Sequence, residues 1–492
     1  MKDERDEPHI SGSASSAAAE ASASPALPRG LAQAERGTAT TGIARRAAAV
    51  LLLGAVAVVG VFLVAELTNP TLEGIFTKPP IYGYYDPSLS ILGLGILPAA
   101  ALLIGFATAF VLRKAIPAWL GIAVVIALAV ALAASVTLVR GDTEDLVRRV
   151  SDGDRWLSYA SDIPLVEQHG VRGFAQLHPD LAPEFKYWNT RTHPPGPVIV
   201  LFGIFELLGA VHTLRIATAI AALGMTTALG AYLLGSAGAD QRSAKIATAL
   251  LVAAPGPLLL AYTSMDLVFA AGMSIAAGFL VISASRTRLW WAVAGGAVLG
   301  ATTLMTFATI FVAVAATMHI LVIEKCTRKA AAKLAAAAMG GLAVLASATI
   351  VLGFDLIGSF LAVPASSSPY NAYWIVGAPG AWFVFAGLPV AALGTWGLFR
   401  RTDDGSRPVF AITLMALMIT WALLPSEVTK LRSGELERTW AFAYPALAAS
   451  AAPVVNLWMR SSKRFGHVVL PALMAISIAQ AVLIQVLWDT LF

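Results

Sequence analysis

The chain has 492 residues, of which 58% are hydrophobic and only 13% are charged, whereas soluble globular domains carry about 25% charged residues. This composition excludes a water-soluble globular protein, and the single cysteine, Cys326, excludes an intrachain disulfide and a cysteine-based metal site. The net charge of +5 arises from Lys and Arg in short segments between apolar blocks, which is typical of membrane topology and argues against nucleic-acid binding.

The N-terminal segment differs in composition from the rest of the chain. Residues 1–42 are rich in Ala, Ser, Glu and Pro, with few large apolar side chains, so they are predicted to be a disordered tail. Arg45 and Arg46 then precede the first apolar block, and this flanking charge predicts a cytoplasmic N-terminus. Residues 43–492 are expected to form one transmembrane domain in the plasma membrane.

Apolar blocks near 20 residues long follow one another through this domain, and each is long enough to cross a bilayer as a helix. The blocks lack the alternation of a transmembrane barrel, so the fold class is predicted to be all-α and polytopic. Placing the short basic segments in the cytoplasm gives about 13 spans. These spans are residues 47–67, 89–112, 118–139, 216–235, 245–262, 267–284, 289–304, 305–323, 335–356, 376–398, 409–424, 439–458 and 467–490.

One apolar block does not fit this topology. Residues 198–211 must begin and end outside if the block after them crosses, and they are shorter than the roughly 20 residues of a span. The segment is therefore interpreted as a re-entrant or shallow helix, with a short true span as the alternative.

The topology places most of the unusual polar residues on the extracytoplasmic side. Residues 140–195 form a large outer loop whose apolar residues recur at helical spacing, which predicts short helices lying in the interface. Residues 425–438 form a second outer loop that is too charged for a simple connector. Within the large loop, His193 lies beside Arg191, where a titratable donor can meet a phosphate. Asp266 lies at the end of an apolar block, where a carboxylate is costly, and both a functional and a structural role are open for it.

Three of these features resemble the GT-C superfamily of membrane glycosyltransferases, which use polyprenyl-phosphate-linked sugars on the extracytoplasmic side. The acidic segment GDTED (141–145) follows a span and opens the large loop, HPP (193–195) closes it, and YTSMD (262–266) ends in a boundary carboxylate. The chain more specifically resembles actinobacterial members of this kind in THPPGP (192–197), GFD (353–355), SPYNAYW (368–374) and GELERTW (434–440).

The resemblance implies an inverting sugar transfer from a polyprenyl-phosphate donor to a cell-envelope glycan or lipid acceptor. Such a transfer needs a carboxylate as general base and cations near the leaving phosphate. The base candidates are Asp142, then Asp145 and Glu144, and a divalent cation, Mg or Mn, is a possible addition. The substrate-binding candidates are Arg191, His193, Asp266, Asp355, Tyr370, Lys430, Arg432, Glu435 and Arg438.

Two other functions are compatible with a polytopic helical chain. A secondary transporter or lipid-linked flippase would place its ionisable residues near the bilayer midplane, often in repeated halves. Here no internal repeat is evident, and most charges lie at one boundary. A non-catalytic assembly or export subunit would leave the outer face without convergent acids and cations.

Overall fold

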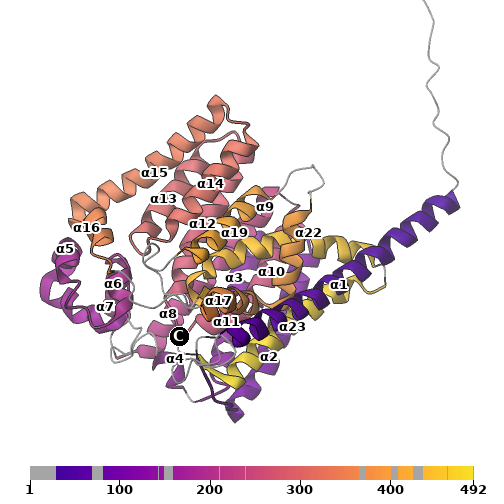
Figure 1. Ribbon diagram of the computed structural model, residues 1–492, viewed down its shortest axis with the longest axis horizontal. Helices are drawn as coiled ribbons and strands as arrows, with labels where there is room; N and C mark the ends of the chain where they lie inside the picture. Colours follow the sequence, from indigo (N-terminus) through magenta and orange to yellow (C-terminus); the bar gives the residue numbers. More distant parts are fainter. Residues whose placement is uncertain are drawn as a thin grey trace, which may run out of the picture.

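Helices make up most of the described residues, as the composition predicts (Figure 1). The computed structural model describes residues 29–68, 81, 83–141, 143–148, 159–209, 211–238, 240–364, 372–400, 408–424, 436–462 and 464–490. Two three-residue strands form the sheet found within these ranges. The protein is thus an all-α, multi-pass membrane protein.

The elements of the first half are α1 (Arg29–Thr68), β1 (Gly83–Tyr85), η1 (Ile91–Gly95), α2 (Ile96–Leu112), α3 (Ala118–Thr137), α4 (Asp145–Arg148), η2 (Tyr159–Asp162), α5 (Ile163–Leu181), α6 (Trp188–Thr192), α7 (Gly196–Leu208), α8 (Thr213–Met225), α9 (Thr227–Gly238) and α10 (Gln241–Val252). Those of the second half are α11 (Pro255–Leu260), α12 (Asp266–Ser285), α13 (Trp290–Thr303), α14 (Thr309–Ile323), α15 (Arg328–Leu352), α16 (Leu356–Leu361), α17 (Ala372–Ala386), α18 (Leu388–Phe399), α19 (Val409–Leu423), α21 (Leu436–Thr439), η3 (Ala441–Ala443), α22 (Tyr444–Ser461), α23 (Gly466–Leu487) and β2 (Trp488–Thr490).

Eight helical stretches of the described residues are long and apolar enough to cross a membrane. A ninth is the pair α17–α18, which bends by 103° at Gly387. The sequence predicts about 13 spans because it also counts α14 and α19, which are shorter apolar helices, the 14-residue helix α13, and the broken pair α10–α11. The larger number stays a prediction.

The first helix begins earlier than the composition suggests. The tail was expected to extend to residue 42, but α1 begins at Arg29 and continues without interruption into the first apolar block. A segment attached to a stable span can extend that helix, because propagation adds hydrogen bonds without the cost of a new nucleus. The difference affects only residues 29–42, since 1–28 lie outside the described part.

The short segment after HPP is helix α7, with 13 residues. At 1.5 Å per residue it is about 20 Å long, less than the roughly 30 Å of a hydrocarbon core. It packs against α5, η2 and α8, and its C-terminal Leu207 is exposed. The length fits the re-entrant interpretation better than a full crossing.

Polar contacts join the helix ends on each side of the bundle. On one side, β1 pairs with β2, and Arg140 forms an ion pair with Asp86 and donates to the carbonyl of Gln485. On the other side, Arg460 pairs with Asp240. The first group contains the ends that the sequence assigns to the outside, and the second contains ends assigned to the cytoplasm, so the relative sidedness of these loops agrees with the predicted topology.

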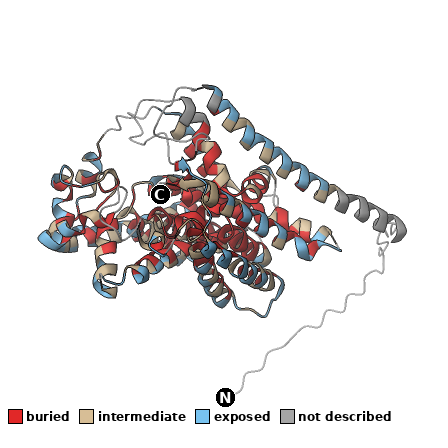
Figure 2. Cartoon of the chain, turned by 90° about the horizontal axis from the view of Figure 1, so that it is seen from below, coloured by how far each residue is buried: buried red, intermediate tan, exposed pale blue. Residues whose placement is uncertain are grey.

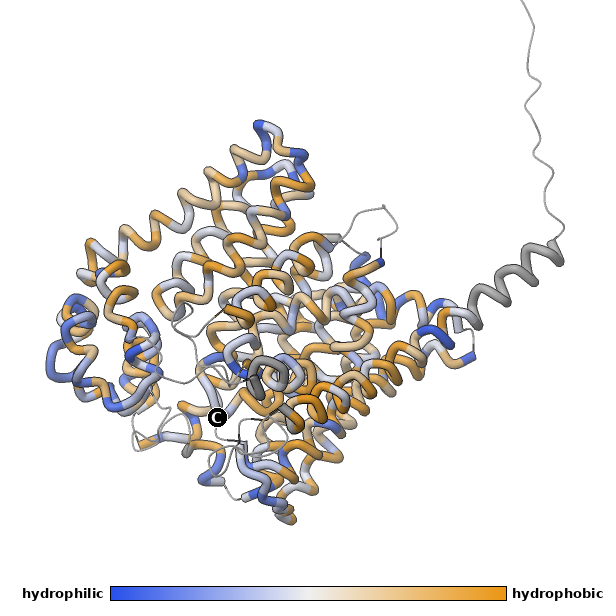
Figure 3. The backbone as a smooth tube through the Cα atoms, in the orientation of Figure 1, coloured by the Kyte–Doolittle hydropathy of each residue, from blue (hydrophilic) through white to orange (hydrophobic). Residues whose placement is uncertain are grey.

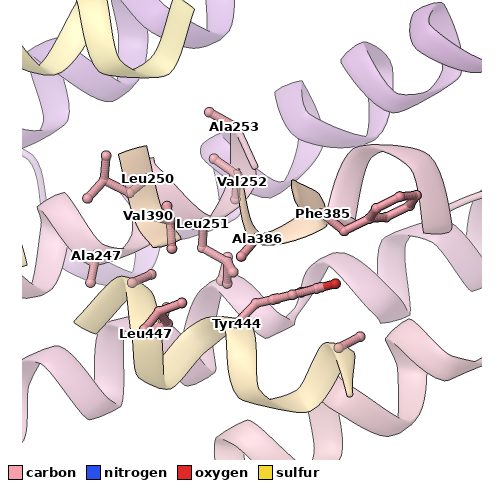
Figure 4. Close-up of a cluster of buried hydrophobic side chains, with 14 of the residues drawn as sticks. Ala247, Leu250, Leu251, Val252, Ala253, Phe385, Ala386, Val390, Tyr444 and Leu447 are labelled. Carbon is pink, nitrogen blue, oxygen red and sulfur yellow. The ribbon is translucent and has the colours of Figure 1, made fainter. Parts of the chain in front are cut away.

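The core lies where α10, α11, α17, α18 and α22 meet. Figure 4 shows Leu250 and Leu251 of α10, Phe385 of α17 and the ring of Tyr444 in one buried cluster. The most buried candidate spans are α12 and α22, whereas α1 flanks the bundle against α17 and α18 with a largely exposed surface (Figure 2). That exposed surface is strongly apolar (Figure 3), as expected for a face in contact with lipid.

The large outer loop forms a lobe beside the bundle. Its helices α5 and α6 lie together with α7, the helix that follows the loop, at the left of Figure 1, next to α15 and α16. The lobe has its own apolar core, which includes Phe174, Phe185 and Val198. The loop therefore contains short helices, and they pack on one another. Their position in the membrane interface stays a prediction.

The tightest helix pair, α13 and α15, depends on glycine. A β-carbon at Gly296 would lie 1.9 Å from the carbonyl oxygen of Ala337, so only glycine lets the two backbones approach this closely. By contrast, a β-carbon at Gly105 of α2 would meet nothing within 4 Å.

We expect Gly296→Ala to lower the free energy of unfolding by about 1–3 kcal/mol, because overpacking forces the helices apart. The matched variant Gly105→Ala should be neutral or slightly stabilising, by up to about 1 kcal/mol. Unfolding in mixed detergent micelles measures both values. Equal effects of the two changes would contradict the close-packing explanation.

Candidate functional site

A buried ion pair joins two segments that are far apart in the sequence. Arg438 of α21 lies with its Nη1 2.9 Å from Oδ2 of Asp266, and the two side chains are only 7% and 8% exposed. Taking both charges out of water is costly unless they are paired with good geometry. The pair therefore fixes the segment that follows the second outer loop against the start of α12.

The carboxylate of Asp266 is further held by its own turn. Ser264 Oγ donates to Asp266 Oδ2 at 2.5 Å and accepts a hydrogen bond from the Asp266 backbone N–H at 3.1 Å. Asp266 is also the first residue of α12, where the helix dipole favours a negative charge. Ser264 was missed by the sequence reasoning, although it lies within the YTSMD motif.

His193 lies in the same electrostatic neighbourhood. Burial lowers the pKa of its imidazole, the charge of Asp266 raises it, and the charge of Arg438 lowers it. The ring lies between aromatic neighbours, with centroids 5.6 Å from Tyr159 and 5.4 Å from Phe269. The structure thus brings together three of the predicted residues, His193, Asp266 and Arg438.

The orientation of the His193 ring determines which chemistry it can perform. Its Nδ1 is 2.9 Å from the Asn189 carbonyl oxygen, which can only accept, so Nδ1 carries the proton. In the neutral ring, Nε2 is then an acceptor. The sequence suggested that His193 donates to a phosphate, whereas this tautomer suits a hydroxyl donor such as a sugar.

The HPP turn is fixed by a close backbone contact. Gly196 N donates to the carbonyl oxygen of Leu304 at 3.0 Å, and a β-carbon at Gly196 would lie 2.2 Å from that oxygen. Glycine after the two prolines therefore lets the turn dock on the end of α13. This contact positions His193 relative to the spans.

A cluster of buried polar residues inside the lobe contacts the short helix α6. Asp162 accepts from the Lys186 backbone N–H at 3.0 Å, and Thr190 interacts with both Asp162 and His178. Desolvation raises the pKa of Asp162 and lowers that of His178 to about 4. None of these three residues was among the predicted site residues; only their burial reveals them.

The structure describes only part of the acidic segment, residues 141–145. Asp142, the first candidate for the base, lies outside the described residues, whereas Glu144 and Asp145 lie at the start of α4. A β-carbon at Gly141 would lie 1.6 Å from Oδ2 of Asp145, so the carboxylate folds back over this glycine. Helix α4 packs against α3 and α8, and α8 packs against α12. The segment is therefore linked to the ion pair through α8.

Two further candidates have structural partners away from the ion pair. Arg191 donates to the carbonyl oxygens of Phe185, at 2.8 and 3.2 Å, and Pro183, at 3.3 Å, which closes the turn before α6. Asp355 caps α16 by accepting from the Gly358 N–H at 2.8 Å. Their substrate-binding roles stay predictions, and the candidates Tyr370, Lys430, Arg432 and Glu435 lie outside the described residues.

The described residues do not by themselves fit a metal ion. No three His, Cys, Asp or Glu side chains among them gather closely enough to hold one, and hard divalent cations take several oxygen ligands. Glu144 and Asp145 are the two described carboxylates of the acidic segment.

Comparison with known proteins gives a likeness in fold only. No family model matches the chain, and no curated protein matches it significantly. Among solved structures, ArnT from Cupriavidus metallidurans bound to undecaprenyl phosphate is 16% identical with a TM-score of 0.42, over 67% of this chain and 60% of ArnT. The apo oligosaccharyltransferase of Archaeoglobus fulgidus is 14% identical with a TM-score of 0.42, over 75% of this chain and 56% of that protein. The chain thus spans less than two thirds of either.

We expect Asp266→Ala to lower the free energy of unfolding by about 3–5 kcal/mol, because it removes the buried carboxylate that pairs with Arg438. Removing both charges in Asp266→Ala/Arg438→Ala should recover part of that loss. The exposed pair Asp240–Arg460, with side chains 44% and 55% exposed, supplies the control: Arg460→Ala should cost at most about 1 kcal/mol. A double variant no more stable than Asp266→Ala would contradict the pairing argument.

The buried His178 predicts a pH dependence of stability. Its pKa is about 4 in the folded protein and about 6.5 unfolded, so between these values the unfolded chain binds more protons. Stability is full above pH 6.5 and falls as the pH drops towards 4, by about 3 kcal/mol in total. His178→Gln should flatten this fall in the melting temperature, whereas His169→Gln, at a partly exposed position of the same helix, should leave it unchanged.

Proposed function

We propose that this protein is a membrane glycosyltransferase that moves a sugar from a polyprenyl-phosphate donor to a cell-envelope glycan or lipid acceptor. The observation that carries the proposal is the buried Asp266–Arg438 pair with His193 beside it. A buried charge pair is weak evidence for stability, and ionisable residues at membrane depth generally indicate a functional site. The combination of an arginine, a carboxylate and an imidazole suits an anionic headgroup attached to a sugar.

The proposed reaction assigns a role to each group. A carboxylate of the acidic segment, Asp142 first and then Asp145 or Glu144, takes the proton of the acceptor hydroxyl. The acceptor oxygen bonds to the anomeric carbon while the bond from that carbon to the phosphate oxygen breaks, which inverts the configuration. The bonding electrons leave with the polyprenyl phosphate, whose charge the Arg438 guanidinium stabilises.

The proposal includes a topology. The chain has about 13 spans with α7 re-entrant, a cytoplasmic N-terminus, and the site on the extracytoplasmic side of the plasma membrane. The charge distribution around the apolar blocks supports this arrangement, as do the contacts that join helix ends on each side. The motifs THPPGP and GELERTW support an actinobacterial type of this enzyme, and Lys430, Arg432 and Glu435 are proposed to contact the donor from the second outer loop.

We expect the purified protein in nanodiscs to release undecaprenyl phosphate from undecaprenyl-phosphate sugars when a glycan acceptor is present, as measured by chromatography over a panel of hexose and pentose donors. Asp142→Asn should lower the rate by at least about a hundredfold, the usual range for loss of a general base. Asp145→Asn and Glu144→Gln test the alternative bases.

Two outcomes would contradict this proposal. Full activity in all three carboxylate variants would exclude the acidic segment as the source of the base. Movement of the intact lipid-linked sugar across the bilayer, with no transfer to any acceptor, would indicate a flippase instead. Glu167→Gln, at an exposed position of α5, serves as the matched control and should keep full activity.

A further inference from the structure

The short turn that carries Arg438 is held by two aromatic side chains from the membrane-spanning helices. Tyr444, the first residue of α22, donates its hydroxyl to the carbonyl oxygen of Glu437 at 2.5 Å. Trp382 of α17 donates its indole N–H to the carbonyl oxygen of Trp440 at 3.0 Å. Both accepting carbonyls lie within two residues of Arg438, one on each side.

The two aromatic residues also support each other. The rings of Trp382 and Tyr444 are stacked with centroids 5.5 Å apart and planes 18° apart, and both side chains are almost completely buried. Figure 4 shows the Tyr444 ring at the edge of the apolar cluster, with its hydroxyl pointing away from the labelled aliphatic side chains. The rings are therefore fixed in the core, while their polar ends face the turn.

The room for this arrangement comes from a glycine on a third helix. A β-carbon at Gly256 of α11 would lie 2.5 Å from the Tyr444 ring and 3.0 Å from the carbonyl oxygen of Phe385. A tyrosine in such a place is a costly way to fill a core, because its hydroxyl must find a partner when it is buried. That partner is the backbone of the turn that carries Arg438.

We propose that Trp382 and Tyr444 are positioning residues that fix the turn 437–440 and thereby aim the Arg438 guanidinium at the phosphate of the lipid donor. This inference rests on the function proposed above. It predicts that both residues strengthen the binding of the phosphate headgroup, and that they do so only by positioning Arg438. A bidentate arginine contact depends strongly on geometry, so a small rotation of the turn weakens it.

The test uses the full-length protein in nanodiscs, with undecaprenyl phosphate and undecaprenol as probes. Tyr444→Phe should weaken undecaprenyl phosphate binding about fivefold, the effect of one neutral hydrogen bond, and leave undecaprenol binding unchanged. Tyr232→Phe makes the same chemical change on α9, away from the turn, and should alter neither. Trp382→Phe should likewise weaken undecaprenyl phosphate binding and leave undecaprenol binding unchanged. Its control is Trp421→Phe, which should alter neither, because the Trp421 indole nitrogen has no hydrogen-bond partner among the described residues.

A double-mutant cycle separates positioning from general stability. If Tyr444 acts through Arg438, then Tyr444→Phe/Arg438→Gln should bind undecaprenyl phosphate no more weakly than Arg438→Gln alone. Additive losses, equal weakening of undecaprenol binding, or a Tyr444→Phe affinity within twofold of Tyr232→Phe would each overturn this inference while leaving the proposed function standing. Unchanged phosphate binding in Arg438→Gln itself would overturn the proposed function and this inference with it.

Discussion

The arrangement of the outer face depends on keeping two opposite charges buried together. Asp266 begins a membrane-spanning helix and Arg438 lies just before another, so neither is fully solvated. Each charge alone would be strongly unfavourable there, and the two together are tolerated because the carboxylate is also bonded by Ser264. This pairing links α12 to the segment that enters α22, the two most buried candidate spans.

The lobe formed by the large outer loop extends this constraint to His193. Helix α6 is short and could not hold its shape alone, but Asp162 and His178 lie buried beneath it. The carbonyl of Asn189 in that helix sets the tautomer of His193, and the docking of Gly196 on α13 sets its distance from the spans. These two backbone contacts thus determine where the loop holds the His193 imidazole.

The ion pairs on the opposite side of the bundle provide a comparison for the outer site. Arg460 and Asp240 form an exposed pair, and Lys333 pairs with Glu324 while also bonding the Ala284 carbonyl. These contacts tie helix ends together and are explained by that alone. The Lys333–Glu324 pair is also largely buried, so burial alone does not distinguish the outer pair. The outer pair differs because a buried histidine of lowered pKa accompanies it, which is why the proposed chemistry is placed there.

The sequence by itself determined that the chain is helical and membrane-embedded, since 58% apolar residues in blocks of span length leave no other way to satisfy the backbone in lipid. It also indicated His193, Asp266 and Arg438 as separate candidates, because polar residues at apolar boundaries are costly. Only the tertiary structure decided that these three lie together, that Asp355 and Arg191 bond local backbone, and that Trp382 and Tyr444 hold the turn of Arg438. Contacts of this kind join residues from distant helices, and a local pattern of hydropathy and charge carries no information about which helix ends meet.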